Sequence, residues 1–250
     1  EEQKKKYVTP LARGRFLGSF CLTEPGAGTD MMAAATTAVR DGDHYVINGT
    51  KTFISNGPFA DMYLVFCWTD RAAGRKGMSA LIVPKGTPGL RPGVPFRKTG
   101  LRSSQTSEVF FRDCPVPREN LLGDEGRGIP MAMIGLDHAR VGAAAVSVGI
   151  LQAALDESIR YSKERVHFGN PISRQQAVAW MIADMATDLT AARFLTYHAA
   201  WLKDQKRPFT TESAIAKLSG SEKAMYHTTR AVQIHGGYGY IKGAKVERLM

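Results

Sequence analysis

The sequence of 250 residues is poor in cysteine, with only three. Cys21, Cys67 and Cys114 are far apart, and no two of them form a CxxC pair. This spacing argues against a disulfide framework and against a zinc site. Each cysteine lies in an apolar, strand-like run, so we expect three buried free thiols and no bound metal.

Long apolar runs are also missing. No run approaches the roughly 20 residues of a membrane-spanning helix. The first residues, EEQKKKYVTP, lack the apolar centre of a signal peptide. With 44% hydrophobic and 22% charged residues, the chain has enough apolar material for a sizeable core. We therefore expect a soluble, intracellular protein that has no membrane partner.

Features of nucleic-acid binding are scarce, although the net charge is +10. The basic residues are dispersed, and the densest run, QKKK at 3–6, is typical of a solvated helix face. Aromatic residues do not interleave with a basic stripe. We expect no nucleic-acid partner, because a phosphate-bearing cofactor or substrate explains the positive charge more simply.

Residues from about 17 to 122 have the pattern of a β domain. HYVINGTKTFIS (44–55) predicts a hairpin, because Asn48-Gly49 can supply the positive φ angles of a tight turn. The other β-rich runs are MYLVFCW (62–68), MSALIVP (78–84) and SEVFFRD (107–113). No strand alternates with a long helix, which disfavours a doubly wound parallel sheet and favours an antiparallel barrel or sandwich.

The β signals stop after GDEGRGIP (123–130). Three candidate helices follow, at 131–165, 174–203 and 212–234, with apolar residues at helical spacing. VGAAAVSVG in the first of them would let helices approach closely, and Gly236-Gly237 would end the third. Three long helices with short links predict an up-down bundle.

The fold class expected from these patterns is α+β with several domains. We divide the chain into a remnant of a helical domain at 1–16, a middle β domain at 17–125 and a truncated helical bundle at 126–250. Both ends look cut, because VERLM (246–250) stops in mid-pattern. A three-helix segment of this apolarity would normally need a further partner.

The stretch LTEPGAGTD (22–30) resembles a glycine-rich phosphate loop only superficially. It lacks the lysine of a Walker loop, and Gly26-Ala27-Gly28 lacks the third glycine of a dinucleotide fingerprint. Taken alone, it is a glycine turn that joins strands. We expect Glu24 and Asp30 to support the turn and cap backbone groups rather than to catalyse.

Three further stretches change this interpretation. They are KTFISNG (51–57), RVHFGNPISRQQA (165–177) and QIHGGYGY (233–240). Together with TEPGAGTD they resemble the acyl-CoA dehydrogenase family, and GLDHAR (135–140) and VERLM also fit its pattern. The motifs occur in the order and spacing of the family from about residue 15 to the end, so the resemblance covers nearly the whole chain.

The resemblance implies an N-terminal helical domain, a middle β domain and a C-terminal helical domain. It implies FAD as the cofactor, lying between the β domain and the last helices and touching a neighbouring subunit of a homotetramer. This chain would then lack most of the first domain and the end of the third.

The resemblance also assigns residues to FAD. The loop would clamp the isoalloxazine ring, with glycines that let the backbone approach it closely. Phe53 would lie against the ring, the Ser55 hydroxyl would bond flavin N5, and Arg165 would suit the pyrophosphate. His167 could add a polar contact or simply be exposed. The full cofactor set is Phe20, Leu22, Thr23, Thr29, Phe53, Ser55, Arg165, Phe168, Gln176, Gln233, Gly236 and Gly237.

The implied reaction is α,β-dehydrogenation of an acyl-CoA thioester to the enoyl-CoA, with electrons passing to an electron-transfer flavoprotein. Thr29, Asp137 and Arg140 match positions near the substrate, although Asp137 and Arg140 could also form a simple ion pair on one helix face. The catalytic base is missing, because the family position within GLDHAR is Ala139. Glu247 belongs to a helix motif, so we expect the base beyond Met250.

The residues are also compatible with two other functions. One is a relative that resembles acyl-CoA oxidases, and the other is a flavin-binding or acyl-CoA-binding module without a base. The expected location is the bacterial cytoplasm, or the mitochondrial matrix in a eukaryote, where such enzymes serve β-oxidation or amino-acid catabolism.

Overall fold

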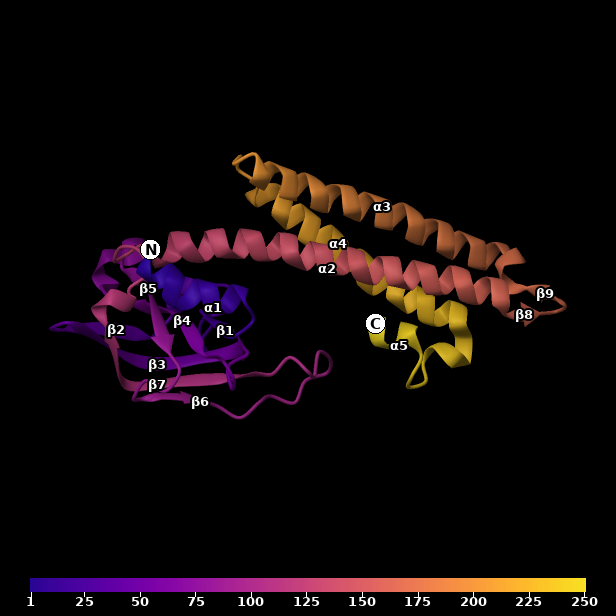
Figure 1. Cartoon of the computed structure of the whole chain (residues 1–250). Helices are drawn as coiled ribbons and strands as arrows, with labels where there is room; N and C mark the ends of the chain where they lie inside the picture. Colours follow the sequence, from indigo (N-terminus) through magenta and orange to yellow (C-terminus); the bar gives the residue numbers. More distant parts are fainter. The chain divides into compact units, whose positions relative to one another are not determined.

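The computed structural model describes residues 1–250, which separate into two compact units, Glu1–Met133 and Ile134–Met250. The first unit holds the large sheet and the second is built from long helices (Figure 1). Helix α2 (Gly128–Glu164) begins in the first unit and continues in the second. The predicted α+β class, with a β part followed by helices, is confirmed.

A seven-stranded sheet forms the first unit. Its strands are β1 (Gly18–Cys21), β2 (Thr37–Asp41), β3 (His44–Ser55), β4 (Met62–Trp68), β5 (Met78–Pro84), β6 (Leu90–Pro92) and β7 (Thr106–Pro117). The hydrogen-bonded order is β1-β4-β2-β3-β7-β6, and β5 pairs with β4. Most pairings are antiparallel, as expected, but β4 pairs in parallel with β1 and β2. The sheet is therefore mixed.

Short helical segments border this sheet. They are η1 (Lys4–Val8), α1 (Thr9–Ala12), η2 (Met31–Ala33), η3 (Arg71–Lys76) and η4 (Arg118–Asn120). Tyr7 of η1 packs against Met62 and Ile82 of the sheet, and its hydroxyl donates to Asn120 Oδ1 at 3.1 Å. The first helical residues are thus part of the core of this unit.

Strands β4 and β5 form the centre of the core because both of their faces are covered. On β4, Val65 and Cys67 belong to one buried cluster, and Phe66 and Trp68 belong to another. Strands covered on both faces read as continuous apolar runs, which explains the sequence MYLVFCW. Ile129 at the start of α2 packs into the second cluster.

All three cysteines are buried and unpaired, as the sequence predicts. Burial raises the pKa of the Cys21 and Cys67 thiols to about 12 and that of Cys114 to about 11. Such thiols stay protonated at neutral pH and are poor nucleophiles and poor metal ligands.

The predicted hairpin turn at Asn48-Gly49 is wrong. Strand β3 runs through both residues, and the turn that joins it to β2 lies at Gly42, where φ is +54°. The register of β3 against β7 shifts between Ile47 and Gly49, so the glycine lies in a bulge. A Cβ atom on Gly49 would be 2.7 Å from Thr36 Cα, so the position needs glycine for a close backbone approach.

Replacing Gly49 by alanine should therefore destabilise the first unit. The added methyl group would collide with backbone that cannot move aside as a flexible side chain can. We expect Gly49→Ala to lower the free energy of unfolding by about 1–3 kcal/mol, measured by urea or thermal denaturation. Gly100→Ala is the control, because its Cβ would meet no atom within 4 Å. Equal stability of the two variants would contradict this account.

The second unit is a bundle of α2 with α3 (Gln176–Asp204) and α4 (Thr210–His235). The shorter elements are β8 (Val166–His167), β9 (Asn170–Pro171), η5 (Ile172–Arg174), η6 (Gly236–Gly239) and α5 (Lys245–Leu249). Short links join consecutive long helices, as the bundle prediction requires. Gly236 ends α4 with φ +55°, which confirms the predicted stop.

Small residues set how closely the helices pack. Ala144 of α2, Ala199 of α3 and Ala216 of α4 share one buried cluster, and Gly220 faces Ser147. A larger cluster of Leu, Ile and Met side chains lies further along the same helices. The predicted role of the small residues in α2 is confirmed.

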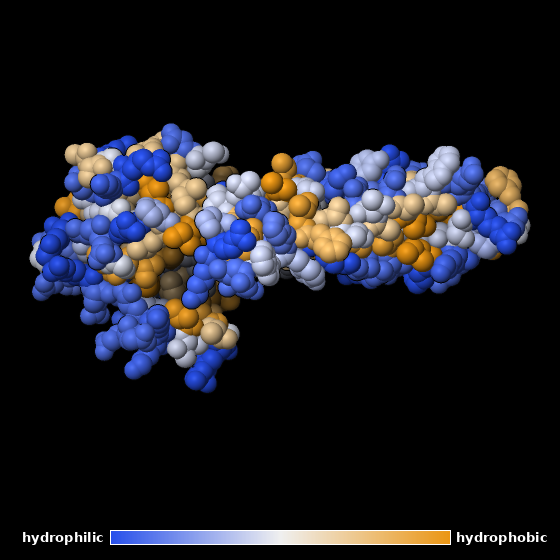
Figure 2. Space-filling model, turned by 90° about the horizontal axis from the view of Figure 1, so that it is seen from above, coloured by the Kyte–Doolittle hydropathy of each residue, from blue (hydrophilic) through white to orange (hydrophobic).

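Helix α2 nearly coincides with the helix predicted at 131–165, but it contains a stretch that is more apolar than expected. By length and composition it could cross a membrane, although a core helix of a soluble protein passes the same test. Aromatic side chains are also exposed on the neighbouring helices, including Trp180, Phe194 and Tyr197 of α3 and Tyr226 of α4. Figure 2 shows apolar side chains at the surface of the helical unit among polar ones.

Candidate functional site

The end of β1 and the loop after it hold three of the predicted ring contacts. Phe20 is 41% exposed on β1, and its ring centroid is 4.9 Å from that of Phe66. Leu22 and Thr23 follow, both half-buried. The Thr52 N–H donates to the Thr23 carbonyl at 2.9 Å, which ties this loop to β3.

The rest of LTEPGAGTD is a turn, as expected. Glu24 and Ala27 exchange backbone hydrogen bonds of 3.0 and 3.1 Å around Pro25-Gly26. The Asp30 carboxylate accepts from the Met32 N–H at 3.0 Å and caps η2. Thr29 lies between these features and is exposed. The supporting roles predicted for Glu24 and Asp30 are confirmed.

Phe53 lies in a strained bulge of β3. The register against β7 shifts between Lys51 and Ile54, and Phe53 adopts φ +56°. A positive φ is costly for a bulky residue, and such strain is concentrated at functional sites. The Phe53 side chain is 69% exposed, with the ring of Phe96 5.5 Å away. The bulge thus presents an aromatic ring to solvent from the middle of a sheet.

The structure brings the two predicted ring-binding segments together. The Ser19 hydroxyl donates to the Ser55 carbonyl at 2.9 Å. A second hydrogen bond, from the Thr52 N–H to the Thr23 carbonyl, joins the same two segments. A flat ring system needs an aromatic or apolar face and free hydrogen-bond donors. Phe53 supplies the face, and no protein acceptor takes the Thr23 N–H. The residues present therefore fit an isoalloxazine ring.

Sequence reasoning missed Lys51, which is fully buried behind this loop. Its Nζ atom donates to Glu24 Oε1 at 2.7 Å and to the Leu22 carbonyl at 3.1 Å. The Glu24 carboxylate also accepts from the N–H groups of Ala35 and Thr36 at 2.6 and 3.1 Å. The available signal was a lysine at an inward position of a strand, with a glutamate in the neighbouring loop.

Burial alone would raise the pKa of Glu24. The positive charge of Lys51 and the hydrogen bonds from Lys51, Thr36 and Ala35 outweigh burial and hold the pKa of this carboxyl below its ordinary value. The loop therefore contains a glutamate that is ionised at neutral pH although it is buried.

In the second unit, Arg165 and Phe168 lie at the end of α2 and in the β8–β9 hairpin. Both are exposed, and the Arg165 guanidinium lies 5.9 Å from the centroid of the Tyr238 ring. Phe168 and Gly169 have φ angles of +51° and +77°, which form the hairpin turn and leave Phe168 87% exposed. The His167 ring packs against Phe168 at 4.1 Å.

The predicted contacts to a neighbouring subunit's cofactor lie on three elements of the second unit. Gln176 begins α3, Gln233 lies in the last turn of α4, and Gly236 and Gly237 follow α4. All four are exposed, and a Cβ on either glycine would meet no atom within 4 Å. The glycines therefore leave room for a ligand against the backbone.

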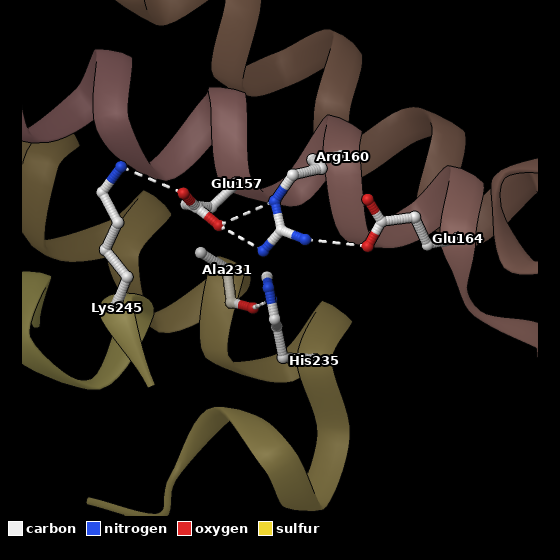
Figure 3. A network of polar contacts seen from close by, with 6 residues as sticks. All are labelled: Glu157, Arg160, Glu164, Ala231, His235 and Lys245. Atoms are coloured by element: carbon white, nitrogen blue, oxygen red, sulfur yellow. Dashed lines mark hydrogen bonds and ion pairs between the residues drawn. The ribbon is translucent and has the colours of Figure 1, made fainter. Parts of the chain in front are cut away.

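A polar network holds the segment after these glycines (Figure 3). Glu157 of α2 accepts from Arg160 at 2.7 Å and from Lys245 of α5 at 3.0 Å. Hydrogen bonds from Arg160 and Lys245 keep the pKa of Glu157 below its ordinary value. The His235 ring stacks on Tyr161 at 4.2 Å, and its Nδ1 atom bonds to the Ala231 carbonyl at 2.8 Å. These contacts fix the residue before the Gly236–Gly239 turn and the first residue of α5.

The predicted substrate residues Asp137 and Arg140 form an ion pair on one face of α2. The second oxygen of Asp137 accepts from the Thr210 hydroxyl at 2.6 Å, so α4 also holds this carboxylate. Asp137 is buried and Arg140 half-buried. The simple ion pair that the sequence left open is thus present, and the remaining N–H groups of Arg140 stay free to bind.

Two family models match the sequence: the acyl-CoA dehydrogenase middle domain at residues 19–114 and the acyl-CoA dehydrogenase C-terminal domain at residues 126–250. The short-chain specific acyl-CoA dehydrogenase of Clostridium acetobutylicum is 50% identical over the whole chain. This chain covers 66% of that relative, slightly less than two thirds of its length.

Solved structures show the same similarity. Butyryl-CoA dehydrogenase from Megasphaera elsdenii has a TM-score of 0.97 and 47% identity, with all of this chain and 65% of that chain covered. A chain in a structure described as the electron transferring flavoprotein of Acidaminococcus fermentans has a TM-score of 0.97 and 52% identity, with all of this chain and 66% of that chain covered.

The depressed pKa of Glu24 predicts a pH dependence of stability. In an unfolded chain a glutamate titrates near pH 4.3, and the folded value is lower. The contribution of Glu24 to the free energy of unfolding is therefore complete above that pH and lost as the pH falls through the folded pKa. In urea denaturation, the stability gap between wild type and Glu24→Gln should shrink below about pH 4. Glu2→Gln, at an exposed position, is the control; a gap that stays constant to pH 3 would refute the assignment.

The strain at Phe53 predicts an unusual order of stabilities. Glycine adopts positive φ without the steric cost that alanine has, so Phe53→Gly should be more stable than Phe53→Ala by about 1 kcal/mol. At an ordinary strand position the order is reversed, and Val39→Gly against Val39→Ala on exposed β2 is the matched control pair. Chemical denaturation of the four variants gives the comparison. The same order at both positions would show that Phe53 is not strained.

Proposed function

This chain belongs to the acyl-CoA dehydrogenase family, and on that premise we propose that it forms the FAD-binding and substrate-binding part of a short-chain acyl-CoA dehydrogenase. The enzyme would remove the α and β hydrogens of an acyl-CoA thioester and give the enoyl-CoA. The observation that carries the proposal is the strained and exposed Phe53 beside the free Thr23 N–H. The short chain length follows the names of the Clostridium and Megasphaera relatives.

The residues of the first unit would hold the flavin ring. Phe53 and Phe20 offer aromatic surface, and Leu22 and Thr23 offer backbone groups at the end of β1. Ser55 and Thr29 would add hydroxyl groups, Ser55 toward flavin N5 and Thr29 toward ring and substrate. When bound, FAD supplies the acceptor for the β-hydrogen, which leaves the substrate as hydride.

The second unit would hold the diphosphate and the adenosine. Arg165 presents a planar guanidinium that suits a pyrophosphate, and the exposed ring of Phe168 suits an adenine face. Gln176, Gln233, Gly236 and Gly237 would contact the FAD of an adjacent subunit. The open space above both glycines supports that role.

Asp137 and Arg140 would contact the acyl-CoA, together with Thr29. Arg140 is oriented by its ion pair with Asp137, which the Thr210 hydroxyl holds in turn. No candidate residue supplies the base that removes the α-proton. Position 139 is alanine, and Glu247 forms an ion pair with Lys242. The proposal therefore assigns the base to a carboxylate outside residues 1–250.

The proposal includes two protein partners. The first is an electron-transfer flavoprotein that removes the electrons, supported by the similarity to the Acidaminococcus structure. The second is a further copy of this chain in a homotetramer, supported by the exposed aromatic residues Trp180, Phe194, Tyr197 and Tyr226 on α3 and α4. We place the enzyme in the bacterial cytoplasm or the mitochondrial matrix.

Anaerobic visible spectroscopy of the complete protein tests this function. We expect a yellow protein whose flavin band bleaches with butyryl-CoA and less with long-chain acyl-CoAs. Arg165→Ala should weaken FAD binding by about tenfold or more, the effect of losing charge-assisted hydrogen bonds. Lys163→Ala, at an exposed position two residues earlier, is the control. A colourless protein that takes up no FAD would refute the proposal, and a yellow protein that never bleaches would refute the dehydrogenase activity.

A further inference from the structure

A fully buried lysine lies directly behind the proposed ring-binding loop. The Lys51 side chain has no exposed surface and pairs with Glu24, which is 5% exposed. A lysine is almost never fully buried unless it is paired. A buried ion pair seldom stabilises a protein more than two packed apolar side chains would. The stability of the sheet therefore does not explain why a charged residue occupies this position.

The second contact of Lys51 points to another role. Its Nζ atom donates to the Leu22 carbonyl at 3.1 Å, and that carbonyl belongs to the peptide group between Leu22 and Thr23. The C=O and N–H of a trans peptide point in opposite directions, and the chain has no cis peptide bond. The Thr23 N–H is therefore directed away from Lys51, and no acceptor in the protein takes it.

The ammonium group polarises this peptide. Hydrogen bonds with an ionised partner are roughly twice as strong as neutral ones, and each bond in a chain strengthens the next. The Thr23 N–H is thus a stronger donor than an ordinary backbone N–H. Its position is fixed as well, because the Thr52 N–H holds the Thr23 carbonyl and Glu24 is anchored to the N–H groups of Ala35 and Thr36.

We propose that Lys51 is a positioning residue that acts through the Leu22–Thr23 peptide to raise the reduction potential of the bound flavin. The proposal rests on the proposed function, because it requires the flavin ring at Leu22 and Thr23. The ring gains electron density on reduction, so a stronger N–H donor stabilises the reduced form more than the oxidised form. Glu24 balances the charge, which lets the ammonium group stay buried beneath the loop.

The test is the reduction potential of the FAD-bound complete protein, measured by spectroscopic titration against a reference dye. Lys51→Met removes the ammonium group at similar length, and the double variant Lys51→Met/Glu24→Gln does so without leaving a buried charge unpaired. Glu24→Gln breaks the same ion pair but keeps the ammonium on the Leu22 carbonyl. Tyr45→Phe, which removes a hydrogen bond at the other end of β3, is the structural control.

We expect both variants without Lys51 to bind reduced FAD about tenfold more weakly relative to oxidised FAD, a fall of about 30 mV for a two-electron couple. Glu24→Gln and Tyr45→Phe should not lower the potential. A purely structural role would weaken both forms of FAD equally and leave the potential unchanged.

Two results would overturn this inference but not the proposed function. One is an unchanged reduction potential in the double variant, and the other is a fall in Glu24→Gln as large as that in Lys51→Met. If Lys51→Met does not fold, the double variant decides. A wild-type protein that binds no FAD would overturn the proposed function and this inference together, so the two failures can be told apart.

Discussion

The contact between Lys51 and Glu24 organises the region on which the proposed chemistry depends. Glu24 joins the loop after β1 to the segment before β2, and Lys51 joins the same loop to the middle of β3. The Lys51–Glu24 ion pair thus connects the loop after β1, the segment before β2 and the middle of β3. Removing one partner would leave an uncompensated charge in the core, which is far more costly than losing a surface pair. The loop is therefore anchored on its buried side, and its exposed side stays free to bind a ligand.

In both units, a residue with positive φ turns a phenylalanine ring toward solvent. Two of the three aromatic residues assigned to the cofactor, Phe53 and Phe168, adopt a positive φ, and both are exposed. One lies in a bulge inside a sheet and the other in a two-residue hairpin turn. In both places an irregular backbone turns a large apolar side chain outward, although burial would stabilise it more. A flat ligand that covered both rings, as the proposed function requires, would remove that exposure.

Much of the architecture could be predicted from the sequence because it follows from local patterns. The strand-rich part, the three long helices and the glycine stop at Gly236 all rest on periodicity and turn chemistry. Motif resemblance indicated the candidate residues, and in the structure the strand that carries Phe53 and Ser55 is bonded to the segment of Phe20 and Thr23, through Thr52–Thr23 and Ser55–Ser19 hydrogen bonds. Asn48-Gly49 was misread, because only the close approach of Thr36 shows that this glycine serves a bulge. Lys51 was missed for a similar reason, since its partner is 27 residues away and pairing across that distance leaves no local pattern.

The three cysteines have a practical consequence because of where they lie. Cys21, Cys67 and Cys114 are all in the first unit, and the second unit has none. Each thiol is shielded from solvent and protonated, so it cannot react with an alkylating reagent until the surrounding strands separate. The rate of thiol modification therefore reports the opening of the β-rich unit alone, even while the helical unit unfolds or assembles. Unfolding of the β-rich unit can thus be followed with the native cysteines, without an added label.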